Sequence, residues 1–178
     1  MPAKIQTPDW PAAIHRQLKV WDVRQVAHVP DAGHTRLLKL CGGDKAMRVV
    51  PLTTEEEGVA VLAGAWLGGA HGALLMQSSG VGNCVNMLSL PRTCRLPLLM
   101  LVTMRGEWGE FNPWQVPMGQ ATKAVLELAG VICFRAETPG EVEPTVAAAA
   151  RMAFEGPSAT AVLLAQKLIG VKTFGAGK

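Results

Sequence analysis

Apolar residues occur along this chain in two alternating patterns, and each pattern predicts one kind of element. Short apolar runs predict strands at 23–29, 48–52, 72–76, 96–103, 131–134 and 159–164. Apolar residues three or four positions apart predict helices at 10–20, 35–40, 55–67, 122–129 and 141–154, with one more between residue 82 and Pro91. The alternation indicates an α/β fold: a single three-layer domain over residues 1–178, with a six-stranded parallel sheet and helices on both faces.

The segments that follow the predicted strands are where a parallel sheet binds its ligands. These segments are 30–34, 52–55, 77–83 and 105–119. The first six residues of 77–83 are predicted to form a loop of small residues. The segment 105–119 is predicted to be a long loop, because it contains two tryptophans, two prolines and three glycines. Long loops in compact domains often carry function, so candidate residues are expected there.

Three acidic residues, Glu55 to Glu57, open the predicted helix 55–67 directly before an apolar run. A carboxylate is costly to bury beside apolar side chains unless it has a function there. The alternative is that all three are solvated and complement the positive end of the helix dipole. The local pattern alone favours this second interpretation.

The amino-acid composition indicates whether the protein contacts other proteins, nucleic acids or membranes. Apolar residues make up 49% of the chain, charged residues only 17%, and tyrosine is absent, so part of the surface is expected to contact another protein. The net charge of +3 comes from scattered basic residues, which argues against nucleic-acid binding. The apolar stretch 59–76 approaches the length of a membrane span, but its four glycines favour a buried helix, a turn and a buried strand.

The cysteines and the N-terminus indicate a cytoplasmic protein. Cys41, Cys84, Cys94 and Cys133 are spaced unlike the paired ligands of a zinc site or a dense disulfide framework, so reduced thiols are expected. Residues 1–10 lack the basic and apolar regions of a secretory signal.

Five stretches of the chain match a known family pattern. They are VPDA at 29–32, EEEGVAVLAGAWL at 55–67, LLMQSSGVGNCVNMLSL at 74–90, LPLLMLVTMRGEWGE at 96–110 and PMGQAT at 117–122. In these stretches the chain resembles the pyrimidine-binding domain of thiamine diphosphate-dependent decarboxylases. The resemblance is closest to the alpha subunits of sulfopyruvate decarboxylases and to the matching half of phosphonopyruvate decarboxylases.

The resemblance implies that Glu55 is catalytic. In this superfamily the glutamate that activates the cofactor precedes a helix glycine by nine residues, and Glu55 precedes Gly64 by nine. Glu56 and Glu57 fit this register less well. The Glu55 carboxyl group would bind the pyrimidine ring of thiamine diphosphate, so Glu55 is also an expected cofactor-binding residue.

Further cofactor contacts are implied for residues 76–83, which look like the segment MQNSGLGN of the closest relatives with Ser78 in place of asparagine. The implied cofactor-binding residues there are Gln77, Ser78, Ser79, Gly80 and Asn83. The replacement of asparagine puts any role for an amide at position 78 in doubt. Without the family context, a plain turn is the more common interpretation of such a segment.

Substrate contacts are implied for Asp31 and His34 after the first strand, and for Arg105 after the fourth. Arg105 could bind a sulfonate or phosphonate tail. A structural ion pair of Arg105 with Glu107 or Glu110 is an equal alternative. A histidine in a loop is more often a solvated or capping residue than a functional one.

The family motif that binds diphosphate and magnesium, Gly-Asp-Gly followed by a later Asn, is missing from this chain, so no metal site is expected in it. The resemblance therefore implies a diphosphate-binding beta subunit that holds Mg²⁺, in a hetero-oligomer such as α2β2 or larger. The implied function is that of the alpha subunit of a 2-oxo acid decarboxylase. It would convert sulfopyruvate to sulfoacetaldehyde or phosphonopyruvate to phosphonoacetaldehyde. The alternatives are a thiamine diphosphate-dependent carboligase subunit and a non-catalytic partner module.

Overall fold

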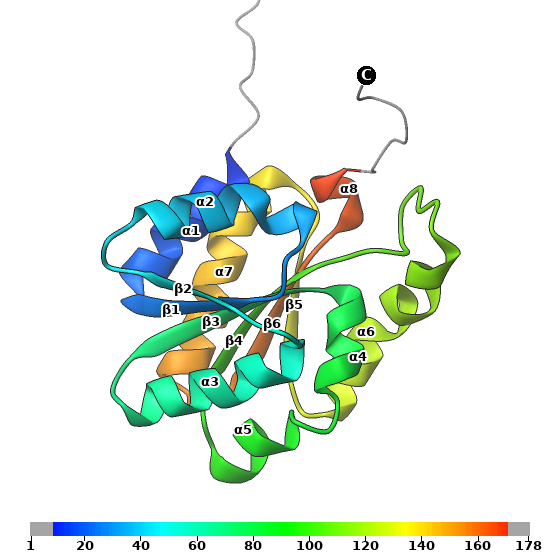
Figure 1. Cartoon of the computed structure of the whole chain (residues 1–178). Coiled ribbons are helices and arrows are strands. Elements are labelled where there is room, and N and C mark those ends of the chain that lie inside the picture. The colour runs from blue at the N-terminus through cyan, green and yellow to red at the C-terminus, as the bar shows by residue number, and fades with distance from the viewer. Residues whose placement is uncertain (1–8, 171–178) are drawn as a thin grey trace, which may run out of the picture.

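Six parallel strands form one sheet in the order β2-β1-β3-β4-β6-β5 (Figure 1). The structure is a computed structural model that describes residues 9–170. The strands are β1 Val23–His28, β2 Arg48–Pro51, β3 His71–Gln77, β4 Leu98–Thr103, β5 Ile132–Ala136 and β6 Ala159–Leu164. The prediction of a parallel six-stranded α/β fold is confirmed. The prediction about a secretory signal rests mostly on residues 1–8, which lie outside the described residues.

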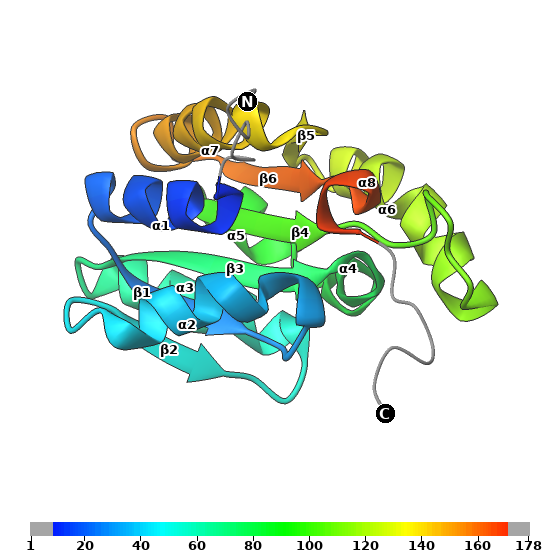
Figure 2. The ribbon, with the colours of Figure 1, turned by 90° about the horizontal axis from the view of Figure 1, so that it is seen from above.

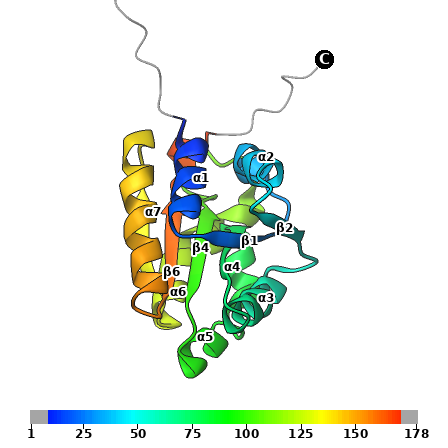
Figure 3. The same ribbon diagram turned by 90° about the vertical axis from the view of Figure 1, so that its left-hand side faces the viewer.

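Two sets of helices cover the two faces of this sheet. On one face lie α1 (Trp10–Val20), α2 (Thr35–Gly43) and α7 (Pro139–Phe154); on the other lie α3 (Glu55–Leu67), α4 (Ser78–Cys84) and α6 (Val116–Leu128). Figure 3 shows α7 and α3 on opposite sides of the strands. Neighbouring strand residues alternate between the two cores, so Leu75 packs in the core of α1 and Leu74 in that of α3. This alternation explains why β3, β4 and β6 are apolar over most of their length.

All strands end on the same side of the sheet, where α4 and the short helix α8 (Gln166–Ile169) begin (Figure 2). The neighbouring strands β1 and β3 are followed by helices on opposite faces, α2 and α4. A parallel sheet has a crevice beyond the strand ends where its connections diverge in this way. The fold therefore places a candidate site at the carboxyl ends of β1 and β3.

Two boundaries around β3 and α4 differ from the sequence prediction. The predicted loop 77–82 is helical from Ser78, and the predicted helix up to Pro91 is split into α4 and α5 (Ser89–Cys94) by a turn at 85–88. Small residues such as Ser and Gly have low helix propensity, which is why the pattern indicated a loop. Packing of α4 against α3 and α6 stabilises the helix instead.

The long loop after β4 is shorter than predicted. A 3₁₀ turn occupies Pro113–Gln115, and α6 begins at Val116, within the segment predicted to be a loop. Pro117 lies in the first helical turn, where its missing N–H would have no partner in any case. This proline therefore marked a helix start.

The apolar stretch 59–76 forms most of α3, a turn and most of β3, as predicted. Within residues 9–170, no helix has the length and apolar character needed to cross a membrane.

Candidate active site at the carboxyl edge of the sheet

The three acidic residues at the start of α3 have different environments. The side chain of Glu57 folds back to accept a hydrogen bond from Thr53 N at 2.8 Å, and it forms a capping box with Thr54. Glu56 is exposed, whereas Glu55 is only 7% exposed. The capping box thus occupies one carboxylate and leaves Glu55 as the buried one.

Two residues of α4 hold the Glu55 side chain. Asn83 Nδ2 donates a hydrogen bond to Glu55 Oε2 at 2.8 Å. Gly80 packs against the same group, since a β-carbon at Gly80 would lie 2.6 Å from Glu55 Cγ and closer still to the carboxylate oxygen Oε1. Of the described side chains, Asn83 is the one that donates to this carboxylate. Oε1 packs against Gly80 and accepts no hydrogen bond from a described side chain.

Asp31 joins the ends of three strands. Its Oδ2 accepts hydrogen bonds from Thr103 Oγ1 at 2.6 Å and Gly33 N at 3.1 Å, and its Oδ1 accepts one from Gln77 Nε2 at 3.1 Å. Gln77 and Thr103 are the last residues of β3 and β4. The crevice beyond β1 and β3 is therefore spanned by one carboxylate that accepts three hydrogen bonds.

The two serines after Gln77 form different hydrogen bonds. Ser79 Oγ donates to Gln77 Oε1 at 2.8 Å, which fixes the orientation of the amide that also bonds Asp31. Ser78 is fully buried, and its Oγ accepts a hydrogen bond from Arg105 N at 3.1 Å. Ser78 thus fastens the loop after β4 to α4. The contact between Ser78 and a cofactor stays a prediction. The buried hydroxyl group of Ser78, which already accepts a hydrogen bond, does not favour it.

Arg105 forms a partly buried, bidentate ion pair with Glu110, one of the alternatives that the sequence left open. Arg105 Nε lies 2.6 Å from Glu110 Oε2, and Nη2 lies 2.7 Å from Oε1. The guanidinium lowers the pKa of Glu110 to about 2, so this carboxyl group is ionised. Glu107, the other alternative, pairs with Arg135 at 2.8 Å.

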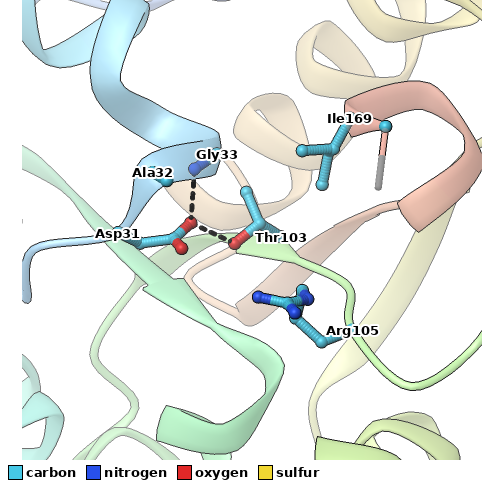
Figure 4. Close-up of a pocket in the computed structure, with 7 residues that line it drawn as sticks. Asp31, Ala32, Gly33, Thr103, Arg105 and Ile169 are labelled. Carbon is cyan, nitrogen blue, oxygen red and sulfur yellow. Dashed lines mark hydrogen bonds between the residues drawn. The ribbon is translucent and has the colours of Figure 1, made fainter. Parts of the chain in front are cut away.

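Asp31 and Arg105 face one cavity of about 150 Å³ (Figure 4). Its lining residues are Asp31, Ala32, Gly33, Thr103, Arg105, Ile169 and Gly170. Of the polar contacts among described residues, none joins Asp31 directly to Arg105. Since a water molecule takes up about 30 Å³, the cavity has room for a small polar group or for one end of a longer molecule.

His34 is not among the residues that line this cavity. The imidazole has no exposed surface, and its Nε2 lies 3.1 Å from Leu101 O. Burial lowers the pKa of His34, so the neutral ring donates Nε2–H to that carbonyl. Nδ1 has no hydrogen-bond partner among the described residues. The position gives His34 a structural role at the start of α2 and does not support the predicted substrate contact.

Within residues 9–170, the cysteines form neither a disulfide nor part of a metal-binding cluster. The four cysteines are free, and burial raises the pKa values of Cys41 and Cys84 to about 12, so both remain protonated. Across residues 9–170, no group of three or more His, Cys, Asp or Glu side chains is arranged to hold a metal ion. Binding of Mg²⁺ by a partner subunit stays a prediction.

Three residues at this edge of the sheet were not among those predicted from the sequence: Thr103, Gln166 and Ile169. Thr103 is a polar residue that ends an otherwise apolar strand, and this was a usable signal for a site at the strand ends. Gln166 and Ile169 belong to α8, whose four residues are too few to show helical periodicity.

The sequence is similar to alpha subunits of sulfopyruvate decarboxylase. It is 36% identical over 153 residues to subunit alpha from Methanococcus maripaludis, which covers 85% of this chain and 92% of that one. It is 38% identical over 130 residues to the subunit from Methanocaldococcus jannaschii, covering 72% and 77%. A phosphonopyruvate decarboxylase from Streptomyces viridochromogenes is 42% identical over 108 residues, 60% of this chain and 27% of that protein. The chain matches no protein-family model.

The fold is also found in a larger enzyme. The 2-oxoglutarate:ferredoxin oxidoreductase from Magnetococcus marinus superposes with a TM-score of 0.68 at 12% identity, covering 95% of this chain and 34% of that one. At such low identity the likeness shows the fold alone, and it agrees with the three-layer α/β architecture. The family follows from the sequence identity over most of the length of the two alpha subunits: this chain belongs to the sulfopyruvate decarboxylase alpha subunits.

Proposed function

We propose that this chain is the pyrimidine-binding alpha subunit of a two-subunit, thiamine diphosphate-dependent 2-oxo acid decarboxylase. The substrate would be sulfopyruvate or phosphonopyruvate, with sulfoacetaldehyde or phosphonoacetaldehyde as the product. Family membership supports the decarboxylase activity. The structural observation that carries the proposal is the buried carboxylate of Glu55, held by Asn83 and packed against Gly80.

The residues around Glu55 fit the pyrimidine end of the cofactor. A neutral heterocycle needs an acceptor or donor at its ring nitrogen and close backbone approach, and Glu55 Oε1 beside the short side chains of α4 can supply both. When bound, thiamine diphosphate supplies the electron sink that lets the bond to carbon dioxide break. Glu55 would share a proton with the ring nitrogen, and Asn83 would keep its carboxyl group oriented. Gln77 and Ser79 would support the site through the Asp31 network.

The substrate would occupy the cavity between Asp31 and Arg105. Glu110 already offsets much of the Arg105 charge, so an anionic tail would be bound mainly through directed N–H donors of the guanidinium. Asp31, fixed by three donors, would meet the other end of the substrate.

A partner subunit would complete the site. The relatives are named as alpha subunits, which implies a second subunit, and this chain lacks the Gly-Asp-Gly motif that would bind diphosphate and Mg²⁺. We place the cofactor between the two chains, in a hetero-oligomer such as α2β2 or larger.

The test is reconstitution with a beta subunit that carries the Gly-Asp-Gly motif, in the presence of thiamine diphosphate and Mg²⁺. Sulfopyruvate and phosphonopyruvate are supplied separately, and carbon dioxide and aldehyde are measured. Stoichiometric aldehyde supports the proposal. Products consisting only of ketols would point to a carboligase, and a stable complex without turnover of any 2-oxo acid would point to a non-catalytic module.

A further inference from the structure

Gln166 connects the C-terminal helix α8 to the loop that carries Arg105. Its side chain is 1% exposed and uses both ends of its amide. Oε1 accepts hydrogen bonds from the backbone N–H groups of Glu107 at 2.9 Å and Trp108 at 3.0 Å. Nε2 donates to Glu110 Oε2 at 2.9 Å. One buried amide thus fixes the loop backbone and the carboxylate that pairs with Arg105.

Glu110, which Gln166 holds in place, in turn fixes the orientation of Arg105. Its carboxylate takes the Nε and Nη2 edge of the guanidinium, so the plane of that group is set by the position of Glu110. Nη1 donates to no described residue and is the nitrogen left for a ligand. Figure 4 shows the Arg105 guanidinium directed toward the cavity that Thr103 and Ile169 also line.

Helix α8 contributes to the cavity at both of its ends. Gln166 at its start holds the Arg105 loop, and Ile169 at its end lines the cavity directly. A change in the position of α8 would therefore move both Ile169, which lines the cavity, and the guanidinium group of Arg105.

We propose that Gln166 is a positioning residue that acts through Glu110 to hold Arg105 in place for the anionic tail of the substrate. This inference rests on the proposed function, because it assumes that the tail of the 2-oxo acid enters this cavity. Gln166 does not touch the substrate. It determines specificity for the tail without taking part in bond cleavage.

The experiment uses the assembled two-subunit enzyme with two variants of Gln166. In Gln166→Glu the oxygen that accepts from the loop amides is kept, but the donor to Glu110 is replaced by a like charge. In Gln166→Leu both interactions are lost. Gln17→Leu is the matched control, because Gln17 Nε2 also donates to a glutamate, Glu143, at 3.2 Å.

Kinetics with sulfopyruvate and with pyruvate, which lacks the tail, provide the main readout. Pyruvate is measured as a substrate, or as a competitive inhibitor if it is not turned over. Both Gln166 variants are expected to raise KM for sulfopyruvate about tenfold, the equivalent of about 1.4 kcal/mol, with kcat nearly unchanged. The KM or Ki for pyruvate should change less than about twofold, and Gln17→Leu should change neither constant.

Two further measurements separate positioning from loop stability. Hydrogen exchange of the Glu107 and Trp108 amides should accelerate in Gln166→Leu but not in Gln166→Glu, since only the leucine removes their acceptor. The effects of Gln166→Leu and Arg105→Lys on KM for sulfopyruvate should be non-additive, because both act on one interaction.

A rise of KM for sulfopyruvate alone, non-additive with Arg105→Lys, would support the positioning role of Gln166. Equal rises of KM for both substrates, or additive effects with Arg105→Lys, would overturn the positioning role. If the wild-type complex turns over neither sulfopyruvate nor phosphonopyruvate, the proposed function itself fails, and the inference fails with it.

Discussion

Gly80 lies so close to Glu55 that no β-carbon fits between α4 and the carboxylate. The buried acid and the glycine are on different helices, and each helix starts directly beyond the carboxyl edge of the sheet. The position of the carboxylate therefore depends on the absence of a side chain from the neighbouring helix.

Gly80→Ala should displace Glu55. The added methyl group would overlap Glu55 Cγ and the carboxylate, so we expect a loss of about 1–3 kcal/mol in the free energy of unfolding. Turnover of the assembled enzyme should fall about 10²-fold, since small displacements of catalytic groups have effects of that size. Denaturant unfolding and steady-state kinetics give the two quantities.

The control for this substitution is Gly64→Ala in α3, where nothing lies within 4 Å of an added β-carbon. It should stabilise the chain by about 0.5–1 kcal/mol, because alanine loses less backbone entropy in a helix. Equal destabilisation by both substitutions would contradict the proposed contact.

Glu55→Gln should abolish most of the activity while leaving the fold intact. Glutamine can still pair with Asn83, but it cannot share a proton with the cofactor, so kcat should fall about 10²–10⁴-fold. Glu56→Gln changes an exposed neighbour and should leave kcat within twofold. The rates of the two reconstituted variants decide the matter, and full activity of Glu55→Gln would leave the buried carboxylate without its proposed role.

Asp31→Asn should weaken the junction of β1, β3 and β4. The carboxylate accepts hydrogen bonds from Thr103, Gly33 and Gln77, and an asparagine amide would set an N–H group against at least one of these donors. We expect a loss of about 1–3 kcal/mol in the free energy of unfolding, together with lower turnover.

Asp22→Asn is the comparison for Asp31→Asn. Asp22 forms an exposed pair with Arg24 and has a positive φ of 49°, which asparagine tolerates. Its effect on unfolding should stay within about 0.5 kcal/mol. A loss for Asp31→Asn that also stays within about 0.5 kcal/mol would show that the Asp31 network adds little stability.

Stability at acid pH should depend on Glu110. Its folded-state pKa of about 2 lies below the ordinary value of 4.5, so its contribution to stability is full above pH 4.5. The contribution is lost as the pH falls from 4.5 toward 2, because the unfolded state then binds the proton more readily. Glu110→Gln should therefore be less stable than wild type at pH 7, and the difference should shrink as the pH falls. Urea unfolding between pH 7 and pH 3 measures this difference, and a constant difference would contradict the assignment.

The strand and helix pattern was readable because a parallel sheet is buried on both faces. The strand Leu98–Thr103 is then apolar up to its last residue, Thr103, which is polar and lies at the strand end. The local pattern at Glu55 favoured a solvated helix start, and only the register of Glu55 with Gly64, matched to a family, indicated a function for it.

Other features depended on contacts between distant parts of the chain. The loop after β4 contains Glu107 and Glu110 at similar distances from Arg105 in sequence, and only the folded loop brings Glu110 to the guanidinium. His34 was indistinguishable in sequence from an exposed loop histidine until the packing of β4 buried it.

The sequence by itself thus determined the α/β class, the family and the carboxylate at the start of α3, because these follow from local periodicity and short motifs. The tertiary structure decided which side chains share the cavity. Gln166 reaches Glu110 across 56 residues of chain. Gly80 and Ser78 of α4 fit their neighbours on α3 and in the loop after β4. Such interactions depend on positions in space that a one-dimensional pattern does not contain.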